Sequence, residues 1–289
     1  MNRFFKSAPA VLFLLACGGG SGDRVVIQNR GSDTLVNVAQ AWAERYAEVN
    51  PAVAVAVTGG GSGTGIAAMI NGTVDIANAS REMRESELED ALARGVSPVE
   101  HIVGFDALAV FLHPSNPIDA ISRAELAQIY AEGGSFVSWT DLGVTVPGCS
   151  SGEIIRISRQ NNSGTYAYFQ EAVLLGDEFK LGSRDMNGSS EVVELVANTP
   201  CAIGYSGLAY ASDHVKMPCV SGDEGSPCVT PSKESALDHS YPIARSLLMY
   251  TAGEPTGAIA EYMNWIKSTE GQCIILRLGY APLSQVTCA

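Results

Sequence analysis

Strand and helix signals alternate along most of this chain, and that alternation limits its fold more than any other feature. The clearest strand signal is residues 52–57 (AVAVAV), which precede a glycine-rich turn at 59–65 and an apolar helical segment at 66–70. Upstream, a β run at 25–27 precedes a segment from 36 to 49 with apolar residues at helical spacing. Because helices supply the crossovers that parallel strands need, this order predicts an α/β fold with parallel sheets.

The same alternation continues to the end of the chain. We expect further strands at 74–77, 99–103, 108–112, 154–157, 202–205 and 247–250, and further helices at 86–93, 122–130, 165–174, 191–197, 258–266 and 269–278. Two of these helices carry an S-x-x-E capping-box pattern, Ser86 with Glu89 and Ser122 with Glu125. With 289 residues, the chain is long enough for two α/β domains.

The first residues have the pattern of a targeting segment. Arg3 and Lys6 precede an apolar run at 8–16 that is far shorter than the roughly 20 residues needed to span a bilayer. We therefore expect residues 1–16 to be a signal peptide. The run ends in Leu-Leu-Ala-Cys, which resembles the lipobox of bacterial lipoproteins and predicts lipidation of Cys17; the alternative is a free cysteine after an ordinary signal. Residues 17–24, which include GGGSG, would then form a flexible, lipid-anchored tether.

The remaining cysteines fit an exported chain, because disulfides persist in oxidising compartments. Six cysteines allow 15 pairings, so the sequence does not select one, although short loops favour 219 with 228 and 273 with 288, which would leave 149 with 201. A metal site is the rival interpretation, but the sequence has no CxxC motif and its four histidines are scattered. The candidate disulfide residues are Cys149, Cys201, Cys219, Cys228, Cys273 and Cys288.

Composition and net charge limit the classes of function that are compatible with this chain. Apolar residues make up 46% of the chain and charged residues 17%, which is a core-forming composition. The 18 Lys and Arg against 31 Asp and Glu give a net charge of −13, which argues against a nucleic-acid partner. An anionic ligand would have to be held by local groups.

Three loops offer such groups. Residues 31–34, 61–65 and 163–165 each combine glycine with small hydroxyl residues directly before an expected helix. Glycine allows close approach of the backbone, and a helix N-terminus presents unpaired N–H groups to an anion. Each loop alone is equally compatible with an ordinary helix cap, but the three together predict an anion site.

Familiar catalytic motifs are absent from these loops. No lysine follows Gly65, as a P-loop requires, and both the dinucleotide fingerprint and the nucleophile elbow fail at Thr64. A serine nucleophile at Ser62 or Ser163 would need a histidine brought near by the fold, so an exported phosphatase remains an alternative. We expect no enzyme activity and no cofactor.

Several stretches closely resemble the phosphate-binding proteins of the phosphate-specific ABC transporter, the Pst system. They are 31–34 (GSDT), 58–65 (TGGGSGTG), 74–81 (VDIANASR), 108–116 (LAVFLHPSN), 158–165 (SRQNNSGT), 202–205 (AIGY) and 279–283 (GYAPL), so the resemblance covers residues 25–285. It implies a type II periplasmic-binding-protein fold, with two lobes that are each a mixed, mostly parallel sheet flanked by helices and with one phosphate in the cleft between them. The implied boundaries are 25–104 and 246–289 for lobe 1 and 105–245 for lobe 2.

The resemblance also implies a set of ligand-binding residues. Thr34 and Ser62 would supply hydroxyl and N–H donors, Arg159 a charged pair of donors, and Ser32 a further donor. Ser163, Gly164 and Thr165 would supply hydroxyl and N–H donors from the second lobe. The implied partners are inorganic phosphate and inner-membrane permease subunits, and we expect a monomer at the periplasmic or cell-surface face of a bacterial membrane.

One position departs from the family pattern. Ser80 stands where well-studied members have an aspartate that accepts the proton of hydrogen phosphate and so excludes sulfate. Asp33 is the nearest substitute acceptor, or else only the N-cap of its helix. Arg81 is either a second cation of the site or a partner for a carboxylate such as Asp33. The departure leaves a receptor for another tetrahedral oxyanion (sulfate, phosphonate or molybdate) as an alternative.

Overall fold

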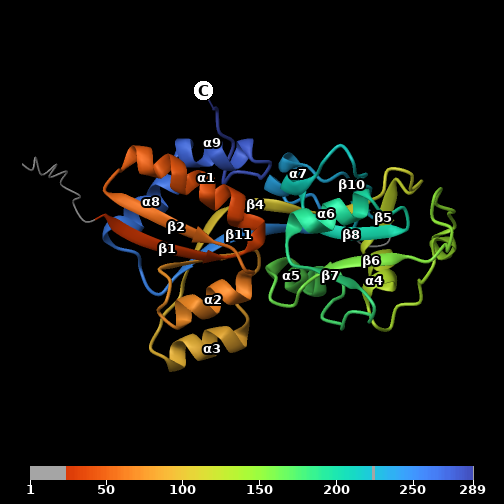
Figure 1. Cartoon of the computed structure of the whole chain (residues 1–289), viewed down its shortest axis with the longest axis horizontal. Helices are drawn as coiled ribbons and strands as arrows, with labels where there is room; N and C mark the ends of the chain where they lie inside the picture. Colours follow the sequence, from red (N-terminus) through yellow and green to blue (C-terminus); the bar gives the residue numbers. More distant parts are fainter. Residues whose placement is uncertain (1–23, 223–224, 289) are drawn as a thin grey trace, which may run out of the picture.

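Two lobes joined by long strands make up the computed structural model, which describes residues 24–222 and 225–288 (Figure 1). The first lobe contains β1 (Val25–Gly31), α1 (Asp33–Val49), β2 (Val53–Thr58), α2 (Ser62–Ile70), β3 (Ile76–Ala79), α3 (Glu85–Ala93), β11 (Ala244–Thr251), α8 (Gly257–Ile266) and α9 (Thr269–Arg277). The second contains β5 (Ala120–Ser122), α4 (Arg123–Tyr130), η1 (Trp139–Leu142), β6 (Ile155–Arg159), α5 (Gly164–Ala172), β7 (Arg184–Met186), α6 (Ser189–Ala197), β8 (Ala202–Gly207), η2 (Leu208–Tyr210), β9 (Cys219–Ser221), β10 (Cys228–Val229) and α7 (Lys233–Leu237). Strand β4 (Val99–Leu112) belongs to both lobes.

A single mixed sheet runs through the two lobes in the order β2-β1-β3-β11-β4-β8-β6-β7. Its pairings are parallel at β1–β2, β1–β3, β6–β7 and β6–β8 and antiparallel at the three pairings that involve β4 or β11. Strand β4 pairs with β11 as far as Ala107 and with β8 from Leu108 onward. The C-terminal segment therefore returns to the first lobe, while the expected boundaries at 104/105 and 245/246 stay predictions.

The prediction of two separate strands at 99–103 and 108–112 is wrong, because β4 is continuous. Gly104 and Asp106 interrupt the apolar pattern of the sequence without interrupting the strand. A Cβ at Gly104 would lie 2.4 Å from the Ile275 side chain, so α9 packs directly on the backbone there. Asp106 is accommodated because Arg245 of the neighbouring β11 pairs with its carboxylate.

Helices cover both faces of the first-lobe strands. Helices α1, α8 and α9 share one core cluster, which includes Trp42 and Tyr262, and α2 packs on the other face through Ile66 and Met69 (Figure 1). The expected capping box at Ser122 and Glu125 is confirmed. The one expected at Ser86 and Glu89 is wrong, because α3 is capped at Arg84, whose N–H donates to Glu87 at 2.9 Å.

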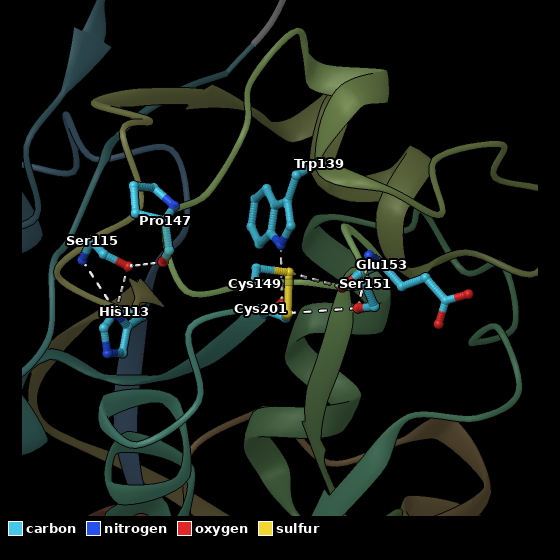
Figure 2. Close-up of a disulfide and its surroundings, with 8 residues drawn as sticks. All are labelled: His113, Ser115, Trp139, Pro147, Cys149, Ser151, Glu153 and Cys201. Atoms are coloured by element: carbon cyan, nitrogen blue, oxygen red, sulfur yellow. Dashed lines mark hydrogen bonds between the residues drawn. A yellow bond between two sulfur atoms is a disulfide. The ribbon is translucent and has the colours of Figure 1, made fainter.

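The described residues contain three disulfides: Cys219–Cys228 and Cys273–Cys288, which short loops favour, and Cys149–Cys201, which that choice leaves. The Cys149–Cys201 disulfide ties the loop after η1 to the start of β8, where the Trp139 indole N–H donates to the Cys201 carbonyl at 3.1 Å (Figure 2). Within the described residues, no helix has the length and apolar character needed to cross a membrane. The predicted signal peptide, Cys17 and most of the tether lie outside the described residues.

Candidate functional site

The N-termini of three helices meet between the lobes. Helices α1, α2 and α5 each begin just after a strand of the sheet, at N-caps Ser32, Gly61 and Ser163. These are the three loops that the sequence predicts to form an anion site. The first N–H groups of a helix have no partner within it, so three such ends aimed at one place form a concentrated set of donors.

Five buried hydroxyl residues lie where these helices meet, and we call them the hydroxyl cluster: Ser32, Thr34, Ser62, Ser80 and Thr165. Four distances connect them, namely Ser32 Oγ to Ser80 Oγ at 2.9 Å, Ser62 Oγ to Ser80 Oγ at 3.4 Å, Ser80 N to Ser62 Oγ at 3.1 Å and Thr34 Oγ1 to Thr165 Oγ1 at 3.1 Å. The last of these joins the two lobes. The cluster thus brings together hydroxyl residues that are up to 133 positions apart in the chain.

Gly164 permits this close approach of the lobes. A Cβ at this position would lie 2.2 Å from Ser62 Oγ and 2.6 Å from Ser80 Oγ. Any larger residue would therefore collide with first-lobe hydroxyls in this arrangement. Ser163, the neighbouring N-cap, accepts from Thr165 N at 3.1 Å and keeps its own O–H as a donor.

Arg245, which no sequence pattern identifies, contacts the hydroxyl cluster through its guanidinium group. Its Nη1 donates to Thr165 Oγ1 at 3.1 Å and to Ser80 O at 3.3 Å, and its Nη2 lies 3.4 Å from Thr34 Oγ1. Asp106 accepts from its Nη2 at 2.7 Å and from its Nε at 3.0 Å. No motif surrounds Arg245 in the sequence, and its partner carboxylate is 139 positions away, so only the fold reveals its place.

The Arg245–Asp106 pair is almost completely buried, with side-chain exposures of 1% and 0%. Burial raises the pKa of the Asp106 carboxyl, and the charge and hydrogen bonds of Arg245 oppose that rise. A buried pair of this kind is costly to break by removing one partner, because the other charge is then left without compensation.

Arg159 and Asp33 are brought together outside the hydroxyl cluster. The Arg159 guanidinium donates to Ser189 Oγ at 2.8 Å and to Asn187 O at 2.9 Å, and it lies 3.4 Å from Asp33 Oδ2. The Asp33 carboxylate also accepts from Ser189 N at 2.6 Å. The alternative of Asp33 as the N-cap is wrong, because Ser32 holds that position. The carboxylate is directed to α6 rather than into the cluster.

Arg81 pairs with a carboxylate, as one of its two expected alternatives states, but the partner is Glu87 and not Asp33. Its guanidinium forms two hydrogen bonds of 2.7 Å to the Glu87 carboxylate, one to each oxygen. Burial alone would raise the pKa of Glu87, but the hydrogen bonds from Arg81 and from Arg84 N–H hold that pKa below its ordinary value. Arg245, Arg159 and Arg81 therefore each face a carboxylate, and the site relies on neutral donors rather than on excess positive charge.

Ser62 and Ser163 are the candidate nucleophiles of the phosphatase alternative. The ring nitrogens of His101 and His113 bond to hydroxyls outside the cluster, and neither Ser62 nor Ser163 has a histidine among its hydrogen-bond partners there. Among residues 24–222 and 225–288, no group of three or more His, Cys, Asp or Glu could hold a metal ion.

Comparison with known proteins places the chain in a family. A model described as the PBP superfamily domain matches residues 19–270. The phosphate-binding protein PstS of Pseudomonas aeruginosa is 32% identical over an alignment of 286 positions, which covers 95% of this chain and 87% of that protein. This chain belongs to the PstS family of the PBP superfamily. PstS of Bacillus subtilis is also 32% identical, over 89% of this chain and 80% of that protein.

Solved structures agree with the architecture. A Clostridium perfringens substrate-binding protein solved with bound phosphate is 25% identical, with a TM-score of 0.77 over 90% of this chain and 100% of that one. A phosphate transport receptor from Vibrio cholerae, at 24% identity and a TM-score of 0.71, has the same fold over 88% of this chain and 99% of its own. The expected two-lobed PBP fold is thereby confirmed.

Proposed function

We propose that this chain binds inorganic phosphate in the cleft between its lobes and delivers it to the permease of an ABC-type phosphate importer. The observation that carries the proposal is the hydroxyl cluster, where three helix N-termini and five buried hydroxyls converge in front of a buried arginine. The family of the chain supports the same ligand, since its relatives are named for phosphate.

Arg245 orients the donors of this site. An arginine has no acceptor, so Thr34 and Thr165 must accept hydrogen bonds from it. One of the two hydroxyls donates to the other at 3.1 Å, which leaves the O–H proton of the accepting hydroxyl free to point toward an anion in the cleft. Donors that are fixed before the ligand arrives lose little entropy on binding, and a hydroxyl oxygen of the cluster can also accept the proton of hydrogen phosphate, which sulfate lacks.

The proposed ligand residues are those whose donors reach the junction of the three helices. They are Ser32, Thr34, Ser62, Ser80, Ser163, Gly164 and Thr165, with Arg245 as the orienting cation behind them. Arg159, Asp33 and Arg81 are assigned supporting roles outside this set, because each is engaged by a partner in its own lobe or across the cleft.

We propose further that the protein is an exported lipoprotein that acts as a monomer. The basic and apolar start of the sequence and the LLAC pattern before Gly18 support a lipid anchor at Cys17. Three disulfides support an oxidising compartment such as the periplasm or the cell surface. Incorporation of labelled palmitate into the wild type and not into Cys17→Ala would test the anchor.

Calorimetry of the mature chain with phosphate, and then with sulfate, tests the proposed ligand. We expect one phosphate per chain and sulfate binding that is weaker by a factor of about 100 or more, a difference of roughly 3 kcal/mol. Absence of phosphate binding would contradict the proposal. Tight sulfate binding would instead favour a receptor for other tetrahedral oxyanions. That function is the second candidate, because Asp33 and Asp106 are both engaged by other groups and no other carboxylate has been placed at the described hydroxyl cluster.

A further inference from the structure

A charged contact between the lobes that is not part of the proposed phosphate site lies at the start of α6. Asp33 is the first residue of α1 in the first lobe, and its Oδ2 accepts from Ser189 N, the first residue of α6 in the second lobe, at 2.6 Å. Both carboxylate oxygens lie over the helix end, since a Cβ at Gly188 would be 3.6 Å from each.

Buried second-lobe groups hold this carboxylate in place. Arg159 Nη2 lies 3.4 Å from Asp33 Oδ2, and Arg159 is itself fixed by Ser189 Oγ and by the Asn187 carbonyl. The Arg159 side chain is 1% exposed and the Asp33 side chain 27% exposed. A carboxylate at a helix N-terminus beside a guanidinium is stabilised by the helix dipole and by the ion pair together.

The backbone of Asp33 is tied to the second lobe as well. The Tyr210 hydroxyl of η2 donates to the Asp33 carbonyl at 2.8 Å. Burial raises the pKa of Tyr210, so this hydroxyl keeps its proton and remains a donor. A neutral contact joins the lobes elsewhere, where Asn162 O accepts from Gly63 N at 3.1 Å and Asn162 Nδ2 donates to Gly60 O at 3.0 Å.

We propose that Asp33 is a closure clasp that sets the lifetime of the bound anion without contacting it. Opening of the lobes requires the carboxylate to leave both Ser189 N and Arg159, whereas the first contact of an anion with an open cleft does not. Loss of the clasp therefore accelerates dissociation and leaves association nearly unchanged. This inference rests on the proposed phosphate-binding function.

The test measures association and dissociation of radiolabelled phosphate on the full mature chain. Asp33→Asn removes the charge and keeps the shape, and we expect its dissociation rate to rise about tenfold, as for one charge-assisted hydrogen bond, with the association rate within about threefold of wild type. Glu44→Gln, at an exposed position on the same helix, is the matched control and should change neither rate.

A second pair of variants isolates the N–H donor. Ser189→Pro removes the N–H at a helix position that tolerates proline, and Ser189→Ala removes only the hydroxyl. We expect Ser189→Pro to raise the dissociation rate as Asp33→Asn does and Ser189→Ala to raise it less. The Asp33→Asn/Ser189→Pro double variant should dissociate more slowly than the product of the two single effects predicts, because both substitutions weaken the contacts of the same carboxylate. Unchanged dissociation in Asp33→Asn, or additive effects in the double variant, would overturn the clasp.

Phosphate binding by the wild type distinguishes a failure of the proposed function from a failure of the clasp. If the wild type binds no phosphate, the proposed function fails. The clasp is then judged by small-angle scattering without ligand, in which Asp33→Ala must have a larger radius of gyration than wild type. Equal radii in that case would overturn the clasp.

Discussion

Arg245 is the residue on which the donor geometry of the site depends. Replacing it with glutamine leaves Asp106 buried without its cation and leaves Thr34 and Thr165 without the donor that orients them. We expect Arg245→Gln to lower phosphate affinity at least about tenfold and the free energy of unfolding by about 3–5 kcal/mol. Calorimetry and urea denaturation measure the two effects.

The double variant Asp106→Asn/Arg245→Gln separates stability from binding. Without either charge, the buried pair no longer carries an uncompensated ion, so most of the lost stability should return. Affinity should stay low, because the orienting donor is still absent. A double variant that regains phosphate binding along with stability would contradict the role assigned to Arg245.

A substitution at Gly164 tests whether the closed arrangement of the lobes is the form that binds the ligand. A methyl group there would lie 2.2 Å from Ser62 Oγ, so Gly164→Ala should keep the lobes from closing around the ligand. We expect phosphate affinity to fall about 100-fold, with little change in melting temperature, since alanine is a good helix former. Gly133→Ala, where a Cβ meets no atom within 4 Å, is the control. Tight binding by Gly164→Ala would show that the closed arrangement is not the binding form.

Among individual residues, the sequence identifies the glycines and hydroxyls of three loops but not the cation behind them. The loops are visible because helix N-termini require local residue types at fixed spacing. Arg245 and Asp106 meet only through the pairing of β4 with β11, which no local pattern encodes. Ser189, the partner of Asp33, is likewise distant in the sequence, at 156 positions, whereas Glu87 lies only six positions from Arg81.

At the scale of elements, local rules predict well where a helix end is independent of its surroundings. The capping box of α4 is confirmed, whereas the cap of α3 shifted by two residues from the expected Ser86. Glu87, rather than Glu89, is the capping carboxylate, because it also pairs with the buried Arg81. Tertiary pairing thus selected between two similar local patterns.

The Glu87 carboxylate gives an element-scale prediction with a pH dependence. Its pKa is lowered in the folded protein, so its contribution to stability is present above the unfolded pKa near 4.5 and is lost as pH falls through the folded value. At pH 7, the free energy of unfolding of Glu87→Gln should be about 1–2 kcal/mol lower than that of the wild type. The difference should shrink below about pH 4.5.

Denaturation of Glu87→Gln and of Glu89→Gln at several pH values checks this prediction. Glu89 is exposed on the same helix, so its variant should remain close to wild type throughout. A stability difference for Glu87→Gln that does not diminish in acid would mean that the ion pair with Arg81 contributes nothing to the fold.

At the scale of the whole molecule, the net charge of −13 and an anionic ligand are compatible. In the proposed site, neutral donors would hold the ligand at a few ångströms, and Arg81, Arg159 and Arg245 are each balanced by a carboxylate. Surface charges beyond about 10 Å are screened at 0.1 M salt. The dissociation constant should therefore change less than about threefold between roughly 0.05 and 0.5 M NaCl, as measured by calorimetry. A steep loss with salt would place the ligand on exposed cations instead.

The return of the C-terminal segment is the part of the architecture that strand and helix signals alone do not predict. Alternation of strands and helices indicates α/β units and parallel pairing, but β11 inserts antiparallel between β3 and β4. The position of a late strand in a sheet depends on which edges of the earlier strands are still unpaired, and no local sequence pattern encodes this. Only the family resemblance predicted that β11, α8 and α9 rejoin the first lobe.

The most direct test of the account is a crystal structure of the mature protein grown with phosphate. We predict one tetrahedral anion at the hydroxyl cluster, with oxygens about 2.7–3.2 Å from Ser62 Oγ, Thr165 Oγ1 and the first N–H groups of α5. Arg245 should remain on Asp106, and Asp33 should remain on α6. An anion bound elsewhere, or a cluster that still bonds only to itself while phosphate saturates the protein, would contradict the account.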